Sequence, residues 1–276
     1  MQKKPAIIIA VLCVISLGLG YWVGLPKEGS GGGGGNSGGG KKEAEFLKQG
    51  LVVYYPFNGN AKDESGNGYH GALNDGASLT IDRKGAAGRA VSFDGVDDHL
   101  STLYPGNIEH NFSFSFWANP GAATRIIAES NSGAAGNHPD HKGLIYYPSG
   151  GSTGDAGIGV NLGTNGIIIV EHAAYHLPAP LVYAADLTGW KHYTVVVINS
   201  RPYLYINGAL VRQGLQSNKT IFWSNLPEYH AHSGEAIGKG GYGAYAGQMD
   251  ELRIYNRTLT EVEVKELYEF EKPKTQ

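Results

Sequence analysis

The chain has 276 residues, of which 41% are hydrophobic and 42 are glycine, and its formal net charge is −3. This composition excludes an intrinsically disordered chain and is typical of a turn-rich β protein. Residues 51–276 carry 16 basic and 22 acidic residues, and this acidic balance argues against nucleic acid as a partner. The one cysteine, Cys13, lies in an N-terminal apolar stretch, so the rest of the sequence has no disulfide framework and no thiolate metal site.

The N-terminus predicts export. A basic stub, residues 1–4, precedes an apolar run at 5–25 that is long enough to cross a bilayer as a helix, and Lys3 and Lys4 set its N-terminus inside. Gly18 and Gly20 also fit a signal-peptide cleavage site, so a membrane anchor and a removable signal both stay open. Both kinds of segment export the rest of the chain. An uncleaved anchor holds the domain outside the cytoplasm, in the periplasm or at the cell surface, whereas a cleaved signal leads to secretion.

Residues 26–49 are predicted to be a flexible linker. Positions 29–40 contain nine Gly, two Ser and one Asn, a composition that cannot bury apolar area. With an uncleaved anchor, this linker would hold the domain off the membrane and let it reorient.

From residue 51 onward, apolar side chains recur with period two, which predicts strands with one buried face. Asn207-Gly208 between two apolar runs predicts a β-hairpin. Because turn residues recur every eight to fifteen positions and no βαβ spacing occurs, the fold class is all-β, an antiparallel two-sheet β-sandwich of jelly-roll type. The alternating sets are Val53, Tyr55 and Phe57, then Val91 and Phe93, then Phe112, Phe114 and Phe116, then the longer run 190–198.

Helical periodicity appears only at the C-terminus. Thr260 is a candidate N-cap and Glu263 stands three residues later, which together form a capping box and predict a short helix over 260–269. We find no internal repeat and no second domain, so one domain is expected over 50–271, with a tail at 272–276.

Five motifs follow one another along the chain, at 56–71 (PFNGNAKDESGNGYHG), 91–98 (VSFDGVDD), 190–192 (WKH), 204–208 (LYING) and 247–257 (GQMDELRIYNR). In this order they resemble a laminin G-like domain of the concanavalin A-like lectin/glucanase superfamily. The resemblance implies a two-sheet jelly roll, often with one calcium ion, that most often recognises a glycan or a protein outside the cell.

The first candidate site is a calcium site. Alternation in 247–257 is expected to put Asp250 on the same strand face as Leu252 and Ile254, so its carboxylate should meet a cation, a nest of backbone N–H groups or a metal ion. The loop 63–68 resembles an oxygen-ligand loop, and the family resemblance suggests that it shares a structural Ca²⁺ with Asp250. An Asx-type turn at Asp63 is the alternative. The candidate metal ligands are Asp63, Asn67, Gly68, His70 and Asp250.

Three further polar clusters are interpreted as structural. The acids at 94–98 favour a turn over a second calcium site, because Asp-Gly is an ordinary turn signal. The histidine clusters at 138–141 and 229–232 favour solvated loops, since nothing nearby completes a metal shell.

The candidate ligand-binding segment is 157–183, which resembles a subgroup of these domains with a Thr-Asn-Gly hairpin and a Glu-His pair. Its aromatic faces and polar tips suit a sugar platform. The alternative is that Leu181 and Tyr183 are core residues while Glu171 and His172 form a buried pair. The candidate ligand contacts are Glu171, His172, Tyr175, His176 and Tyr183.

Catalysis is disfavoured. The Glu-x-Asp-x-Glu strand of glucanases in this superfamily is absent from the sequence, and Tyr205-Ile-Asn-Gly lacks the lysine of the related alginate lyases. The expected function is recognition of a polysaccharide or cell-surface glycan. A protein-binding adhesion or structural surface module is the alternative, and a divergent glycan-active enzyme is less favoured.

Overall fold

The computed structural model describes residues 45–102, 108–133, 138, 140–146, 154–172, 178–224, 236–237, 239–240 and 243–274. The described residues all belong to one compact unit, Lys41–Gln276. Among them no helix has the length and apolarity needed to cross a membrane. The apolar run at 5–25 lies outside the described residues, so the anchor and signal-peptide predictions stay predictions.

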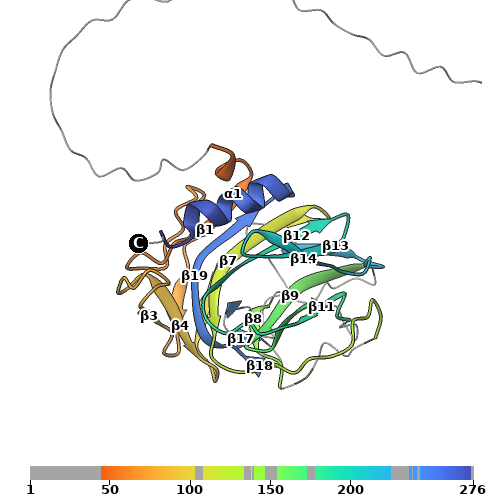
Figure 1. Ribbon diagram of the computed structural model, residues 1–276, viewed down its shortest axis with the longest axis horizontal. Helices are drawn as coiled ribbons and strands as arrows, with labels where there is room; N and C mark the ends of the chain where they lie inside the picture. Colours follow the sequence, from red (N-terminus) through yellow and green to blue (C-terminus); the bar gives the residue numbers. More distant parts are fainter. Residues whose placement is uncertain are drawn as a thin grey trace, which may run out of the picture. The chain divides into compact units, whose positions relative to one another are not determined.

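Two sheets form the domain (Figure 1). The first has the order β14-β13-β12-β7-β19-β4-β3, with β1 paired to β19. The second has the order β11-β10-β9-β8-β16-β5-β2, with the short strands β6, β15, β17 and β18 attached. Pairing is antiparallel except between β15 and β9 and between β18 and β8. The fold is therefore the predicted antiparallel jelly-roll β-sandwich.

The strands of the first sheet are β1 (Leu51–Tyr55), β3 (Ser78–Thr80), β4 (Ala90–Asp94), β7 (Phe112–Pro120), β12 (Lys191–Ile198), β13 (Arg201–Ile206), β14 (Ala209–Gln213) and β19 (Ala246–Tyr255). Those of the second are β2 (Ala72–Asn74), β5 (His99–Ser101), β6 (Ile108–Glu109), β8 (Gly143–Tyr146), β9 (Asp155–Gly163), β10 (Gly166–His172), β11 (Leu181–Ala184), β15 (Thr220–Ser224), β16 (Ala236–Ile237), β17 (Lys239–Gly240) and β18 (Gly243–Ala244).

The main core lies between the sheets. Phe112, Phe114 and Phe116 of β7 pack in one cluster with apolar residues of β9 and β10, and all three are fully buried. The predicted Asn207-Gly208 hairpin joins β13 to β14, and both turn residues have positive φ, as a type I′ turn requires.

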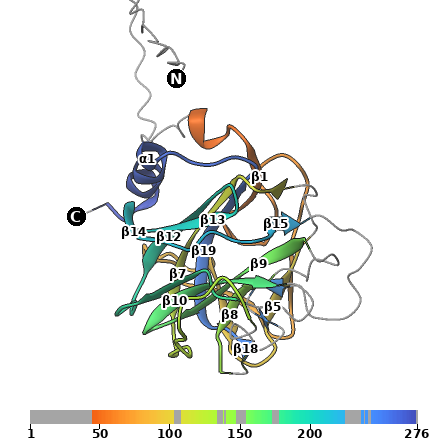
Figure 2. The same cartoon turned by 90° about the vertical axis from the view of Figure 1, so that its right-hand side faces the viewer.

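The central part of the outer face of the first sheet, which points away from this core, is also buried. The sequence predicted one buried face for β7, yet Ser113 and Ser115 are as fully buried as the phenylalanines that alternate with them. The reason is a roof formed by the 3-10 turn η1 (Glu45–Leu47) and the helix α1 (Glu261–Glu271), which lie together (Figures 1 and 2). Local alternation cannot predict this burial, because the covering elements η1 and α1 come from the two ends of the domain.

The contacts of η1 and α1 confirm the predicted capping box and move the N-terminal boundary of the domain. Glu263 N donates to Thr260 Oγ1 and Thr260 N donates to Glu263 Oε2, so the predicted capping box begins α1. Leu47 is fully buried in a second apolar cluster with Val264 and Leu267. The packed domain thus includes residues 45–49, which the sequence had assigned to the linker.

A β-bulge in β19 changes the expected position of Asp250. Pairing with β7 slips between Asp250 and Arg253, and Glu251 at the bulge has φ +52°. Met249, Leu252 and Ile254 therefore point into the core, whereas Asp250 lies opposite Trp117 on the outer face. The prediction that Asp250 shares a face with Leu252 and Ile254 was wrong, because the bulge inserts one residue into the alternation.

Candidate functional site

The loop after β1 is organised by the carboxylate of Asp63. Its Oδ1 accepts from Tyr54 N and Ser65 N, each at 2.9 Å, and its Oδ2 accepts from Ser65 Oγ at 2.9 Å and Tyr69 N at 3.0 Å. Burial by itself would raise the pKa of Asp63, but these hydrogen bonds outweigh it and lower that pKa below its usual value. The hydrogen bonds of Asp63 therefore anchor its own loop to β1, which agrees with the Asx-type interpretation.

The other predicted ligands of this loop are also engaged within the protein. Asn67 Nδ2 donates to Val52 O at 2.9 Å, and His70 Nδ1 accepts from Asp63 N at 3.2 Å. Gly68 takes φ +80°, as a tight turn requires. Asp250 is held in a different network, where Arg83 binds its carboxylate. Four donors on Asp63 and a guanidinium on Asp250 do not fit a shared calcium shell of free oxygen ligands. Calcium binding stays an untested prediction of the sequence, and these contacts lead us to expect a weak effect of the ion.

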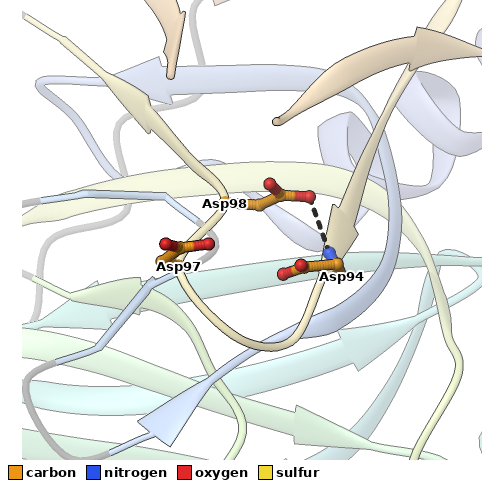
Figure 3. Close-up of side chains that lie close together, drawn as sticks. All are labelled: Asp94, Asp97 and Asp98. Atoms are coloured by element: carbon orange, nitrogen blue, oxygen red, sulfur yellow. Dashed lines mark hydrogen bonds between the residues drawn. The ribbon is translucent and has the colours of Figure 1, made fainter. Parts of the chain in front are cut away.

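The acidic turn between β4 and β5 brings three carboxylates together (Figure 3). Ligand oxygens of Asp94, Asp97 and Asp98 lie within 4.8 Å of one another. Asp98 Oδ2 accepts from Asp94 N at 2.8 Å and Asp94 Oδ1 accepts from Val96 N at 2.7 Å, which are the bonds of a tight turn. These contacts agree with the structural interpretation of this motif.

The histidine cluster at 138–141 is held by local contacts. His138 Nδ1 lies 3.3 Å from Asp140 Oδ2, and the rings of His138 and His141 are 6.1 Å apart. His141 is buried, so the prediction that the whole cluster is a solvated loop fails at this residue. The cluster at 229–232 lies outside the described residues.

The predicted ligand contacts on β10 and β11 do not share one surface. Ile167 and Ile169 of β10 belong to the main core, whereas Ile168 and Val170 form a separate apolar cluster on the outer face of the second sheet. By alternation Glu171 points to the core side and His172 to the outer side, so the two do not form a facing pair.

Tyr183 of β11 packs against the main core while staying half-buried, and Leu181 is fully buried, as the core interpretation expected. Tyr175 and His176 lie outside the described residues.

Glu171 is a buried carboxyl group with a perturbed pKa. Burial raises the pKa of Glu171 to about 7, although a hydrogen bond from the Ser217 hydroxyl and the charge of Lys219 oppose the shift. At neutral pH this side chain is therefore divided between its protonated and ionised forms.

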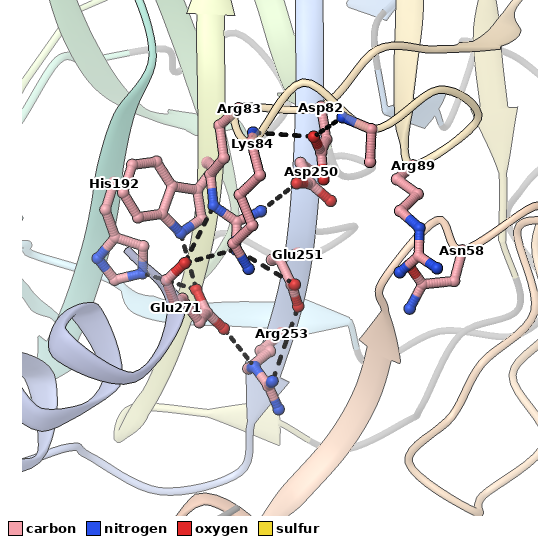
Figure 4. A network of polar contacts seen from close by, with 12 residues as sticks. Asn58, Asp82, Arg83, Lys84, Arg89, His192, Asp250, Glu251, Arg253 and Glu271 are labelled. Atoms are coloured by element: carbon pink, nitrogen blue, oxygen red, sulfur yellow. Dashed lines mark hydrogen bonds and ion pairs between the residues drawn. The ribbon is translucent and has the colours of Figure 1, made fainter. Parts of the chain in front are cut away.

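A network of buried charges under α1 was not foreseen from the sequence (Figure 4). Arg83 pairs with Asp250, and its Nη2 lies 3.3 Å from Glu251 Oε1 and donates to Glu271 O at 2.8 Å. Arg253 Nε donates to Glu271 Oε1 at 2.8 Å. The side chains of Arg83, Asp250, Arg253 and Glu271 are each no more than 2% exposed. Opposite charges from segments far apart in the sequence thus neutralise one another inside the protein.

Aromatic rings line the same network. Trp117 Nε1 donates to Glu271 Oε2 at 2.9 Å, and the Arg83 guanidinium lies 4.7 Å from the Trp117 ring centroid. The Arg253 guanidinium lies 3.7 Å from the ring of Tyr54. Burial and the two arginines lower the pKa of His192 to about 3, so this imidazole is neutral. The local sequence signals were Asp250, for which a cation was one of the expected partners, and Arg253, a charged residue between the core residues Leu252 and Ile254.

Residues 94–265 match the model of a laminin G-type family described as the concanavalin A-like lectin/glucanases superfamily. The chain belongs to this superfamily. The matched range runs from the acidic turn before β5 into α1, so it holds most strands of both sheets of this concanavalin A-like domain.

Solved structures share the fold at low sequence identity. Domain 4 of AbnA, a GH43 extracellular arabinanase from Geobacillus stearothermophilus solved in complex with arabinotriose, is 17% identical with a TM-score of 0.50, and the match covers 79% of this chain and 98% of that one. The binding domain of Paraclostridial Mosquitocidal Protein 1 is 16% identical with a TM-score of 0.54, over 80% of this chain and 52% of that one.

Botulinum neurotoxin type C, whose cell entry depends on interaction with two ganglioside molecules, is 13% identical with a TM-score of 0.52, over 81% of this chain and 52% of that one. This concanavalin A-like chain therefore spans about half the length of the toxin structures and nearly the whole arabinanase domain.

Proposed function

We propose that this protein is an exported, non-catalytic binding module that recognises a carbohydrate, either a polysaccharide or a cell-surface glycan. The observation that carries the proposal is the match to almost the full length of arabinanase domain 4, a domain solved with arabinotriose bound. The ganglioside dependence of the related neurotoxin supports the same class of ligand. Fold similarity at this level of identity supports a class of function and leaves the sugar open.

Four of the described carboxylates are engaged in contacts within the fold, which supports a non-catalytic role. Glycoside hydrolysis uses two carboxyl groups that flank the scissile bond. Asp250, Glu251 and Glu271 instead bind arginines under α1, and Asp63 binds its own loop. These acids serve the stability of the fold.

The N-terminal segment supports display at a membrane. If 5–25 stays in the bilayer, the glycine-rich stretch at 29–40 works as a tether of roughly 20 Å root-mean-square length. A module on such a tether can reach an extended polysaccharide and reorient on it.

The test is a glycan and polysaccharide array probed with the full chain, kept soluble in a detergent without sugar headgroups so that the micelle does not compete. A saturable hit is expected. Tyr183→Ala, on β11, should weaken the hit at least tenfold if the predicted platform binds the sugar, whereas Tyr203→Ala is the matched control, because Tyr203 is a half-buried tyrosine of β13 in the other sheet.

Thermal melting of both variants separates lost binding from lost folding. A blank array from protein that melts cooperatively contradicts carbohydrate recognition and favours a protein partner. A hit that Tyr183→Ala leaves unchanged keeps the function and moves the site away from β11.

A further inference from the structure

A pocket of about 280 Å³ opens beside the buried charge network. Its floor is formed by Pro56, Asp82 and Asp250, which are all buried. Drug-sized ligands occupy pockets of roughly 300–1,000 Å³. This pocket therefore suits one small ring.

The rim of the pocket is polar and solvent-exposed. It includes Asn58, Lys84 and Arg89, and Arg89 Nη1 donates to Asn58 Oδ1 at 3.0 Å (Figure 4). The rim thus offers hydrogen-bond donors above a floor of acceptors.

Two strained residues shape this pocket. Phe57, between the lining residues Pro56 and Asn58, has φ +51°, and Glu251, beside Asp250, has φ +52°. Non-glycine residues adopt such φ values at a cost, and they cluster at sites where a side chain must be aimed. The bulge at Glu251 is also what turns Asp250 toward the pocket side of β19.

One carboxylate oxygen of Asp250 has no hydrogen-bond partner among the described residues. Oδ2 binds Arg83, whereas Oδ1 is buried and unpartnered within the described part of the chain, in a side chain that is only 2% exposed. A buried acceptor without a donor is costly to the protein, so a ligand that donates a hydrogen bond there gains the difference.

The charges around the pocket decide what kind of donor fits. The carboxylates and the cations of the pocket and the adjoining network are equal in number, so no net charge attracts an ion. A cation would meet the rim of Lys84 and Arg89, and an anion would meet the floor of Asp82 and Asp250. A neutral molecule with several hydroxyls can donate to the floor and accept from the rim. The acids are Asp82, Asp250, Glu251 and Glu271, and the bases are Arg83, Lys84, Arg89 and Arg253.

We infer that this pocket holds one neutral sugar ring, with a hydroxyl donating to Asp250 Oδ1 and a neighbouring hydroxyl accepting from Lys84 or Arg89. The inference rests on the proposed carbohydrate function and adds a site on the first sheet, away from the segment at β10 and β11. Ala86 forms part of the pocket wall and gives the ring an apolar contact.

Isothermal titration calorimetry of the full chain tests the pocket with L-arabinose, D-galactose, D-glucose, D-mannose and arabinotriose, and separately with CaCl₂. Ala86→Leu fills the pocket and is expected to weaken sugar binding at least tenfold. Ala87→Leu is the matched control, because Ala87 is an exposed neighbour that does not line the pocket, and it should bind as the parent does. Lys84→Ala changes an exposed rim donor without touching the buried pairs and should weaken binding about threefold.

The outcomes separate this inference from the proposed function. If the parent binds a sugar and Ala86→Leu, shown by melting to be folded, binds it equally well, the carbohydrate function stands and the pocket is not its site. No heat from any of the five sugars overturns the inference, and so does saturable heat from CaCl₂ alone. A sugar-dependent signal that Ala86→Leu and Lys84→Ala reduce while Ala87→Leu retains it supports the pocket.

Discussion

Part of the outer face of each sheet is buried, but by different chemistry. On the second sheet, Ile168 and Val170 of β10 are covered by apolar residues, in a cluster that needs no partner from the chain ends. On the first sheet, Asp250 and Arg253 are buried under η1 and α1 and are neutralised by Arg83 and Glu271. An apolar face is buried by any well-fitting cover, whereas a charged face requires specific partners in specific places.

Removing one partner from the charged face should give the largest effect. Arg83→Met leaves Asp250 buried without its cation and is expected to lower the free energy of unfolding by about 3–5 kcal/mol, measured by urea unfolding. Arg212→Met is the control, since Arg212 of β14 pairs with Glu129 at 2.6 Å while 45% exposed, and such pairs contribute at most about 1 kcal/mol. Equal losses in the two variants contradict a stabilising network.

A second substitution sharpens this result. In the Arg83→Met background, Asp250→Asn removes the charge that was left unpaired, so it should cost less than Asp250→Asn does in the parent. Additive losses in the double variant would mean that the two side chains do not interact.

The buried carboxyl group of Glu171 on the second sheet should give a smaller, pH-dependent effect. The folded-state pKa of Glu171 is raised to about 7 from 4.5, so its contribution to stability is fully present below about pH 4.5 and is lost as the pH rises through 7. Glu171→Gln mimics the protonated form, so this dependence on pH should disappear in the variant. In the parent, the corresponding slope of the free energy of unfolding is up to about 1.4 kcal/mol per pH unit.

Urea unfolding of parent and Glu171→Gln between pH 5 and pH 8 checks this. Glu266→Gln is the control, because Glu266 is an exposed carboxylate of α1. Parallel pH profiles for the parent and Glu171→Gln contradict a shifted pKa.

Calcium should give the smallest effect. Because hydrogen-bond donors already occupy both oxygens of Asp63, we expect millimolar CaCl₂ or a chelator to shift the melting temperature by no more than about 1 °C. Differential scanning calorimetry of the full chain measures this. A larger stabilisation by calcium that Asp63→Asn abolishes would support the calcium site predicted from the sequence.

Much of the fold could be predicted from local patterns. The alternation at Phe112, Phe114 and Phe116 gave a core strand, Asn207-Gly208 gave the hairpin, and Thr260 with Glu263 gave the start of α1. These features depend on neighbours within a few residues, which is the range over which sequence periodicity and capping carry information.

The candidate site was less predictable. Asp250 was singled out correctly as a carboxylate in need of a partner, and a cation, one of the partners expected, is what it binds. The prediction of the strand face on which Asp250 lies was wrong, because a single bulged residue reverses the alternation. The pairing of Arg83 with Asp250 joins positions 167 residues apart, and no local pattern encodes it.

The sequence by itself determined the two-sheet class, the turns and the C-terminal cap, since each depends on side-chain size, period and backbone preference within a short window. Only the tertiary structure decided which charges are buried and which carboxylate oxygen has no hydrogen-bond partner among the described residues. Burying a charge depends on partners from distant segments, so the fold must bring Arg83, Asp250 and Glu271 together before their charges can compensate one another.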